Sequence, residues 1–423
     1  MELFDFISLL AIYLEIAVLA YFEYKMWRTM YTPLNTLMLP YAFMLTVTLL
    51  FCGNFGVAEF YYPSLLVWMV GLVIFAIPSF VFGLAFRDKI RAENGGVIKD
   101  NVNMNVLTAF TTVVVIAFIL RFVSMVGSSP YLPGTEDFGY DYCGGGFWGH
   151  LHRALHALSI IYIYKIDKKH WYYLFLILGM FFVTLMYGVK SWVLIPAMAG
   201  FCMRLFMGKM QLKAGLVIKV LIFSFIVFFV TYSFALVLGQ EEVATFDVIF
   251  EIIYRNFAHY VISGILGWSQ DLQMGILEQG NFDVLLVNVL NLIYVVTGDE
   301  FVNPVNPFFI YNGINGSNVR AFFGTISIHT TALQFFAVVT VVSSIYYIIK
   351  LIALKSKGFF INIVYFFYLG MLCMGWFEIY FYHLQFFEVP FWVLILYFIA
   401  GRAKDDSKSK EESIGYTEQI DVK

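Results

Sequence analysis

Four polar residues recur at intervals of four in a stretch otherwise rich in Ile, Phe and Tyr: Asp247, Glu251, Arg255 and His259. Side chains four residues apart lie on one face of an α-helix, so this spacing predicts a helix with a single polar stripe. On such a stripe Arg255 is a candidate anion ligand, and Glu251 or His259 is a candidate base one turn away. The alternative is an interfacial helix with its polar side in water and a Glu251–Arg255 ion pair worth roughly a few tenths of a kcal/mol.

The run HLHRALH is a second concentration of polar residues, and it contains His150, His152, Arg153 and His156. His152 and His156 have the i, i+4 spacing of two metal ligands on one helix face, as in HExxH. The run offers neither the intervening Glu nor an acidic partner at helical spacing. We therefore favour a hydrogen-bonded polar face that lines a wet cavity over a metal site.

The chain that carries these residues is strongly apolar. It has 423 residues, of which 61% are hydrophobic and 13% charged, and its mean hydropathy is +0.80. Soluble domains carry about 25% charged residues, so this composition excludes a soluble globular protein. A net charge of −3, with no basic domain outside the bilayer, argues against a nucleic-acid partner. The sequence predicts an all-α, polytopic integral membrane protein.

A membrane span needs about 20 mostly apolar residues. Windows of that size predict eleven spans, which begin near Leu3, Leu34, Leu65, Val106, Trp148, Trp171, Ser191, Ala214, Thr331, Phe359 and Glu388. Spans 1–8 occupy residues 1–238 and spans 9–11 residues 331–401, separated by a large loop over 239–330. We expect this loop to form an external subdomain with interfacial or re-entrant helices. The polar segment 402–423 is expected to be a disordered tail.

Basic residues decide the predicted orientation, because cytoplasmic loops of membrane proteins carry an excess of Lys and Arg. A basic loop follows every odd-numbered predicted span up to the ninth: Lys25 and Arg28; Arg87, Lys89, Arg91 and Lys99; Lys165, Lys168 and Lys169; Arg204, Lys209 and Lys213; Lys350, Lys355 and Lys357. The N-terminus and the large loop are therefore expected outside, and the C-terminal tail in the cytoplasm. The first apolar run lacks the basic leader of a cleavable signal peptide, so we expect this run to stay in the membrane as a span.

Five of the 26 Lys and Arg residues fall outside the predicted cytoplasmic regions: Arg121, Arg153, Lys190, Arg255 and Arg320. A cation at membrane depth costs up to about 2.5 to 3.5 kcal/mol at the centre of a span, so a function is expected to offset that cost. One interpretation is an outer cationic pocket for phosphate, which the planar Arg side chain binds bidentately. The alternative is that each cation pairs with an outer carboxylate: Glu136, Asp137, Asp141, Glu251 or Asp271.

Two strings carry a resemblance to a known family. GVKSWVLIPAMAG, residues 188–200, opens a predicted span with Lys190, and NVRAFFGTISIHTTALQFF, residues 318–336, closes the large loop with Arg320. Together with the number of spans, the basic cytoplasmic loops and the single large outer loop, these strings resemble the Wzy-type O-antigen and capsule polymerases. The paired arginine-rich motifs that some members carry in two outer loops are not evident here.

The resemblance implies a glycosyltransferase of the bacterial plasma membrane that joins undecaprenyl-diphosphate-linked oligosaccharide repeat units at the outer face. It implies no cofactor, nucleotide or metal, and it adds a chain-length regulator as a partner besides the lipid-linked substrates. Two alternatives remain. A ligase that moves the finished glycan to another acceptor would use nearly the same residues. A flippase or exporter would use charges near the membrane midplane, where we expect only Glu15.

For the polymerase, the outer cations supply the candidate site residues. Arg255 and Arg320 are the candidates that stabilise the departing diphosphate, with Glu251 or His259 as the base. The candidate substrate-binding residues are Arg153, Lys190, Arg121, His152 and His329.

Overall fold

The computed structural model describes residues 3–52, 57–93, 98–100, 102–133, 135–211, 215, 222, 225–226, 229, 261–275, 281–302, 309–311 and 314–401. Glu251, Arg255 and His259, most of the span expected from Ala214, and the tail over 402–423 lie outside these residues.

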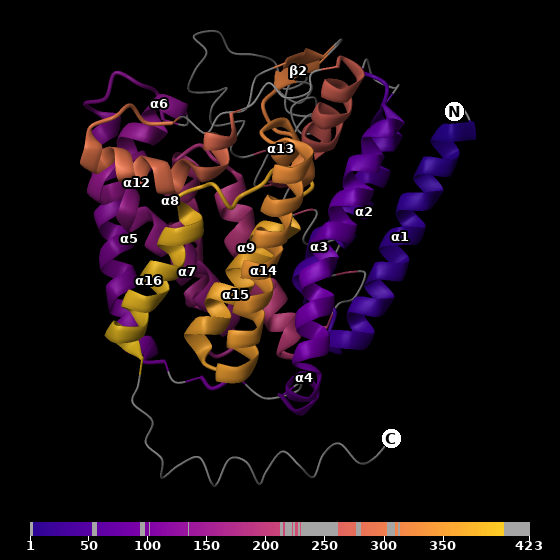
Figure 1. Cartoon of the computed structure of the whole chain (residues 1–423). Coiled ribbons are helices and arrows are strands. Elements are labelled where there is room, and N and C mark those ends of the chain that lie inside the picture. Colours follow the sequence, from indigo (N-terminus) through magenta and orange to yellow (C-terminus); the bar gives the residue numbers. More distant parts are fainter. Residues whose placement is uncertain are drawn as a thin grey trace.

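The described chain is a bundle of helices, with shorter elements gathered at the end where α1 begins (Figure 1). The long helices are α1 (Leu3–Trp27), α2 (Pro33–Phe51), α3 (Leu65–Ala85), α5 (Met104–Val126), α7 (Gly146–Lys165) and α14 (Ala332–Ser356). The shorter helices of the bundle are α8 (Tyr173–Met186), α9 (Ser191–Phe206), α15 (Phe359–Cys373) and α16 (Gln385–Ala400). We call the end where α1 begins the upper end, and the end where α4 lies the lower end.

The remaining elements are short connectors. They comprise η1 (Tyr62–Ser64), α4 (Arg87–Glu93), α6 (Glu136–Gly139), the π-helical η2 (Tyr140–Gly144), a helix over 261–273, η3 (Phe282–Leu286), α12 (Val287–Thr297) and α13 (Ala321–Ile328). Two strands, β1 (Phe309–Tyr311) and β2 (Ile314–Ser317), form a small antiparallel pair, with register partners Phe309 and Ser317. The predicted helical class is therefore confirmed, with this strand pair as an addition.

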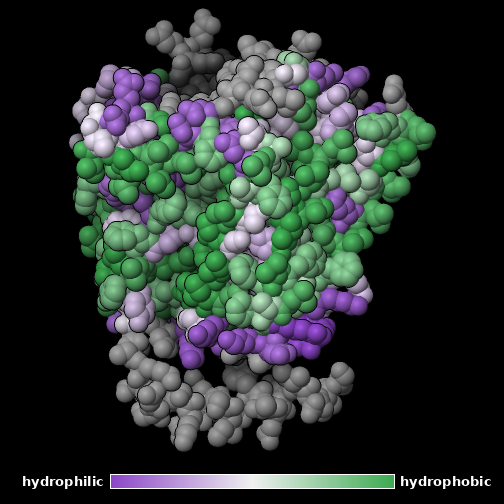
Figure 2. Space-filling model, viewed as in Figure 1, coloured by the Kyte–Doolittle hydropathy of each residue, from purple (hydrophilic) through white to green (hydrophobic). Residues whose placement is uncertain are grey.

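Five helical segments are long and apolar enough to cross a membrane: Leu3–Trp27, Pro33–Phe51, Tyr62–Ala85, Met104–Val126 and Ala332–Ser356. Figure 2 shows a broad apolar belt between two hydrophilic ends. Large apolar side chains are exposed around this belt, for example Leu14 at 62% and Val113 at 67%, as expected where lipid is the solvent. These helices make the chain a membrane protein. The total of eleven spans stays a prediction, because α8, α9, α15 and α16 are apolar but shorter.

The centre of the bundle is α15, which is buried along almost its whole length. It packs against α9, and a glycine permits the close approach: a Cβ on Gly370 would lie 2.6 Å from the carbonyl oxygen of Ile195. Small residues are common at helix contacts in membranes. Lipid chains are as apolar as the helix surfaces, so helices associate there through close packing and not through the hydrophobic effect. The interior of α7, from His152 to Tyr164, is also buried. The polar start of α7 is thereby held against the core.

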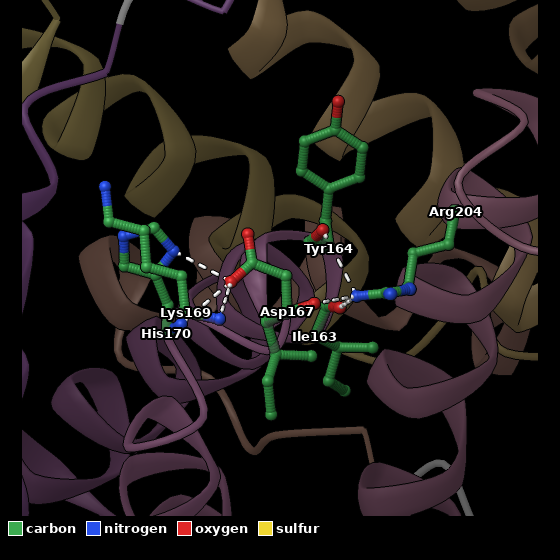
Figure 3. Close-up of polar contacts among 7 residues, drawn as sticks. Ile163, Tyr164, Asp167, Lys169, His170 and Arg204 are labelled. Atoms are coloured by element: carbon green, nitrogen blue, oxygen red, sulfur yellow. Dashed lines mark hydrogen bonds and ion pairs between the residues drawn. The ribbon is translucent and has the colours of Figure 1, made fainter.

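At the lower end, polar contacts terminate α7 (Figure 3). Nη1 of Arg204, near the end of α9, donates to the carbonyl oxygen of Ile163 at 2.9 Å and also to that of Ile166. Asp167 then accepts the backbone N–H groups of Lys169 at 2.9 Å and of His170 at 2.8 Å. The hydrogen bond from the His170 N–H is the main cause that lowers the pKa of Asp167. Arg204 thus satisfies the last carbonyls of α7, which makes its role structural.

Lys350 corrects one sequence-based expectation, because it does not lie in a cytoplasmic loop. The helix continues past it to Ser356, so Lys350 is inside the bundle and only 6% exposed. Its Nζ donates to the carbonyl oxygen of Tyr31 at 3.0 Å. Nearby, Glu23 is fully buried and accepts hydrogen bonds from Ser79 at 2.5 Å and from Tyr347 at 2.6 Å. Glu23 is thus a buried ionisable residue within a predicted span, besides the Glu15 expected from the sequence.

The upper end contains a helix that lies across the others. α12 runs crosswise to the long helices near the top of the bundle (Figure 1). Its apolar side chains are highly exposed, with Leu292 at 71% and Val296 at 85%. The large loop over 239–330 therefore contains a helix at residues 287–297, and the location of this helix in the membrane interface stays a prediction.

Candidate functional site

The glycine run Gly144–Gly146 brings the chain into α7 at the upper end. Gly146 has φ +56°, a left-handed conformation that a residue with a Cβ adopts only with strain. Three residues on, a Cβ at Gly149 would lie 2.7 Å from the carbonyl oxygen of Gly144 and 3.1 Å from Nη1 of Arg153. These glycines let the first turns of α7 fold tightly and leave room for the Arg153 guanidinium.

The first turns of α7 meet the start of α16 in a three-residue charged group. Nδ1 of His150 lies 2.6 Å from Oε1 of Glu388, and Nε of Arg153 lies 2.6 Å from Oε2 of the same carboxylate. The His150 side chain is 60% exposed, whereas those of Arg153 and Glu388 are 11% and 15% exposed. We call these residues the His150–Glu388–Arg153 group. It presents a solvent-accessible imidazole beside a mostly buried ion pair.

This geometry determines what the group can do chemically. A carboxylate only accepts hydrogen bonds, so Nδ1 of His150 donates to Glu388, and the lone pair of the neutral ring is on Nε2. A base oriented by a carboxylate is the arrangement that catalytic histidines use. Within the described residues the terminal nitrogens of Arg153 have no hydrogen-bond partner, although the side chain is only 11% exposed. A candidate base and a cation therefore lie side by side.

Of this group only Arg153 was named as a site residue from the sequence; His150 was noted only as part of the polar run, and the residue missed altogether was Glu388. It lies in the first turn of α16, where the positive end of the helix dipole favours a carboxylate. The available signal was an acidic residue at the outer start of the last predicted span. Its separation of 238 residues from His150 gave no indication of the pairing.

Arg121 lies near the same end but is already engaged by the protein. Its Nε donates to the carbonyl oxygen of Tyr142 at 2.8 Å and its Nη2 to that of Asp141 at 2.7 Å. Its guanidinium also stacks 4.9 Å from the centre of the Trp148 ring. These contacts attach the end of α5 to η2 and α7, so Arg121 supports the start of α7.

The two histidines with metal-ligand spacing are buried, in contrast to the expected wet cavity. His152 is 2% exposed and His156 1% exposed, and their ring centres lie 4.9 Å apart. Nε2 of His152 is 3.3 Å from Oγ1 of Thr184. Nε2 of His156 has no hydrogen-bond partner within the described residues, and its ring lies 5.5 Å from that of Trp192. The expected polar face is thus packed inside the protein.

Arg320 and His329 lie at the two ends of α13, and Arg320 has a carboxylate partner. Its guanidinium forms an ion pair with Asp271 of the 261–273 helix, and both residues are fully buried. Burial raises the pKa of Asp271 to about 6, although Arg320 acts in the opposite direction. The adjacent Ala321 has φ +55°, which is strained for a residue with a Cβ. His329 is 3% exposed, and burial lowers its pKa to about 4.

The connection between α15 and α16, residues 374–384, joins α13 to the region around α7. The N–H groups of Ala321 and Phe322 donate to the carbonyl oxygens of Phe377 at 3.0 Å and Gly375 at 2.7 Å, which holds the strained turn in place. Farther along the connection, the His383 ring lies 5.7 Å from that of Trp192 in α9. Lys190, half-buried, precedes α9 two residues before Trp192. The structure therefore gathers the described candidates at one end of the bundle.

Comparison with known proteins identifies the family to which the chain belongs. A family model described as "Family of unknown function (DUF6337)" matches residues 56–406. The chain belongs to this DUF6337 family. No curated protein and no solved structure matches it.

The part matched by the DUF6337 model contains the His150–Glu388–Arg153 group as well as Arg320 and Asp271, whereas α1 and α2 precede it. Because this family is described as one of unknown function, membership does not indicate an activity. The chemistry of the upper end is therefore the basis for assigning a function to this DUF6337 protein.

The His383 ring provides a pH test of the packing at this end. Burial lowers its pKa to about 4, below the value of about 6.5 for an exposed histidine. As the pH falls from 6.5 towards 4 the unfolded chain takes up a proton before the folded chain does, so folding stability is lost in this window. We expect the thermal unfolding midpoint in detergent to fall less between pH 7.5 and 5 in His383→Gln than in the unaltered protein. Equal slopes for the two proteins would contradict the burial argument.

Proposed function

We propose that this protein polymerises lipid-diphosphate-linked oligosaccharide repeat units at the outer face of the bacterial plasma membrane, with the upper end outside. The observation that carries the proposal is the His150–Glu388–Arg153 group. It combines an exposed imidazole with a guanidinium, at the end of a membrane bundle opposite the basic loops. Glycosyl transfer from a lipid diphosphate requires these two elements.

The reaction assigns one role to each member. A hydroxyl of the acceptor sugar gives its proton to Nε2 of His150, and its oxygen forms a bond to the anomeric carbon of the donor. The bond from that carbon to the diphosphate oxygen breaks, and the electron pair leaves with the diphosphate. Arg153 stabilises the charge that grows on this oxygen, while Glu388 holds the imidazole in its reactive tautomer.

The remaining site residues expected from the sequence have different places in this mechanism. Lys190 is a second cation for the lipid diphosphates. Arg255, Glu251 and His259 lie outside the described residues and stay candidates from the sequence. The burial of Arg320 against Asp271 supports a positioning role for it, in place of the direct contact with diphosphate expected from the sequence.

Two alternatives keep specific support. A ligase would use the same base and cation, with a different acceptor. An ion-coupled flippase is favoured by the buried charges of Glu23 and Lys350 inside the bundle. The lipid-linked glycans of cells with and without the protein separate the three. For a polymerase, we expect cells without the protein to lose the ladder of lengthened chains. An intact lipid-linked ladder that never reaches its acceptor would indicate the ligase. Single repeat units retained at the inner face of the membrane would indicate the flippase.

The proposed orientation is tested by cysteine labelling at two exposed positions. Ser128 follows α5 at the upper end, and Lys168 follows α7 at the lower end. With a membrane-impermeant maleimide, we expect Ser128→Cys to react in intact cells and Lys168→Cys only after the membrane is opened, because basic loops stay inside. The parental chain measures background labelling of its own cysteines. Reaction of both positions in intact cells would defeat the orientation.

A further inference from the structure

Two large aromatic side chains are exposed on either side of the glycine run that leads into α7. Tyr140 is 64% exposed and Phe147 is 70% exposed. Tyr140 begins the π-helical η2, and Phe147 lies in the first turn of α7. π-Helical turns are rare and occur frequently at functional sites. Neither ring takes part in the proposed glycosyl transfer.

The protein supports both rings from the inside. The Tyr140 ring lies against Gly144, where a Cβ would be 2.8 Å from its Cδ2 atom. The Phe147 ring makes an edge contact with the Trp148 ring, and the two ring centres are 5.6 Å apart. Arg121 connects these two supports, because it binds carbonyl oxygens of η2 and also stacks on the Trp148 ring. The rings are therefore held in place although they are exposed.

The surroundings of the two rings are polar. Asp137 and Asp141 are exposed close to Tyr140 in the chain, and the exposed His150 lies one helical turn after Phe147. The short helix α6, which leads directly into η2, lies farther out than the crosswise α12 (Figure 1). Aromatic anchors of the membrane interface form a belt beside the apolar surface, whereas charged carboxylates oppose insertion into lipid. This segment is therefore placed to meet a ligand from the water phase.

An exposed aromatic ring beside carboxylates is complementary to a carbohydrate. A pyranose ring has a face of C–H groups that stacks on an aromatic ring, and its hydroxyl groups donate hydrogen bonds to carboxylates. Aromatic side chains give this contact area at a low cost in conformational entropy, because they have few rotatable bonds. A lipid chain would cover the rings but would make no use of Asp137 and Asp141 as hydrogen-bond acceptors.

We propose that Tyr140 and Phe147 form an aromatic platform on which sugar rings of the lipid-linked glycan stack, with Asp137 and Asp141 as acceptors for sugar hydroxyls. The choice of the lipid-linked repeat unit over other carbohydrates rests on the proposed function. Phe147 and His150 are three residues apart on α7, so their side chains are neighbours on one side of the helix. A sugar stacked on Phe147 is thus adjacent to the imidazole that accepts the proton. The platform positions the acceptor sugar and takes no part in the bond-forming step.

The test measures carbohydrate binding, so that it does not depend on activity. The probe is the single repeat-unit oligosaccharide, released by mild acid from the lipid carrier of host cells that lack the protein. The full-length protein in phosphatidylcholine nanodiscs is titrated with this probe, and saturation-transfer NMR records which sugar protons receive magnetisation. We expect transfer mainly to ring C–H protons on one face of a sugar, because that face lies on the aromatic ring.

Ring variants separate stacking from general apolar contact. Phe147→Ala and Tyr140→Ala should each weaken binding about tenfold, the factor that corresponds to losing the burial of about two methylene groups. Phe147→Tyr keeps the planar ring and should bind normally, whereas Phe147→Leu keeps only apolar bulk and should bind as weakly as Phe147→Ala. Trp171→Ala is the matched control, because it removes an exposed aromatic residue from the lower end. Size-exclusion chromatography checks that each variant is folded.

Three outcomes would overturn the proposal: no saturation transfer to the glycan from the unaltered protein, undiminished binding by both alanine variants, or equal binding by Phe147→Leu and Phe147→Tyr. Loss of the glycan ladder in cells without the protein, combined with any of these outcomes, would leave the polymerase standing and the platform refuted. Binding as expected, in a host whose ladder does not depend on the protein, would refute the polymerase and keep the carbohydrate site.

Discussion

Replacement of Arg153 by alanine is expected to abolish visible chain lengthening, while single repeat units stay on the lipid carrier. Loss of one preorganised donor to a developing charge costs about a hundredfold to a thousandfold in rate. The same change removes the partner that holds the Glu388 carboxylate 2.6 Å away, so the orientation of His150 is weakened as well. The measurement is the length distribution of lipid-linked glycans at matched protein level.

Two further variants define the origin of this effect. Arg153→Lys keeps the charge but loses the planar fork, so we expect only partial recovery of chain length. Arg91→Ala removes an exposed arginine at the lower end and should leave the glycans unchanged. Full-length polymer from folded Arg153→Ala protein would show that the arginine is structural and that the site is misassigned.

Replacement of Arg320 by alanine is expected to destabilise the folded protein by about 3 to 5 kcal/mol, because it leaves the Asp271 carboxylate buried without its counter-ion. The unfolding midpoint and the amount of protein in the membrane are the measurements. Lys165→Ala is the control, since it breaks a partly exposed pair with Asp100, for which about 0 to 1 kcal/mol is expected.

A double variant separates stability from chemistry at this position. Arg320→Met combined with Asp271→Leu replaces the buried pair by apolar side chains, a change that is often neutral or stabilising. We expect this variant to fold and to lengthen chains, because the buried pair then acts by holding α13 in place and not by contact with the diphosphate. A folded double variant that makes no polymer would restore Arg320 to direct contact with the diphosphate.

Composition and charge alone determined the membrane character of this protein. With 61% hydrophobic residues, the chain can satisfy its backbone in lipid only through helices, and apolar helices are present. The start of α7 was also marked by sequence, because HLHRALH concentrates polar groups where an apolar span begins. Local spacing reports such features because helical neighbours are close in sequence.

The partners of the charges were decided only by the tertiary structure. His150 and Arg153 meet Glu388 across more than half of the chain, and Arg320 meets Asp271 across 49 residues. Lys350 was expected in a loop, but α14 continues past it to Ser356, so this cation is buried inside the bundle. An ion pair between distant residues forms only where their helices pack side by side. Which helices do so follows from the close packing of the whole bundle, and the residue spacing along one helix contains no information about it.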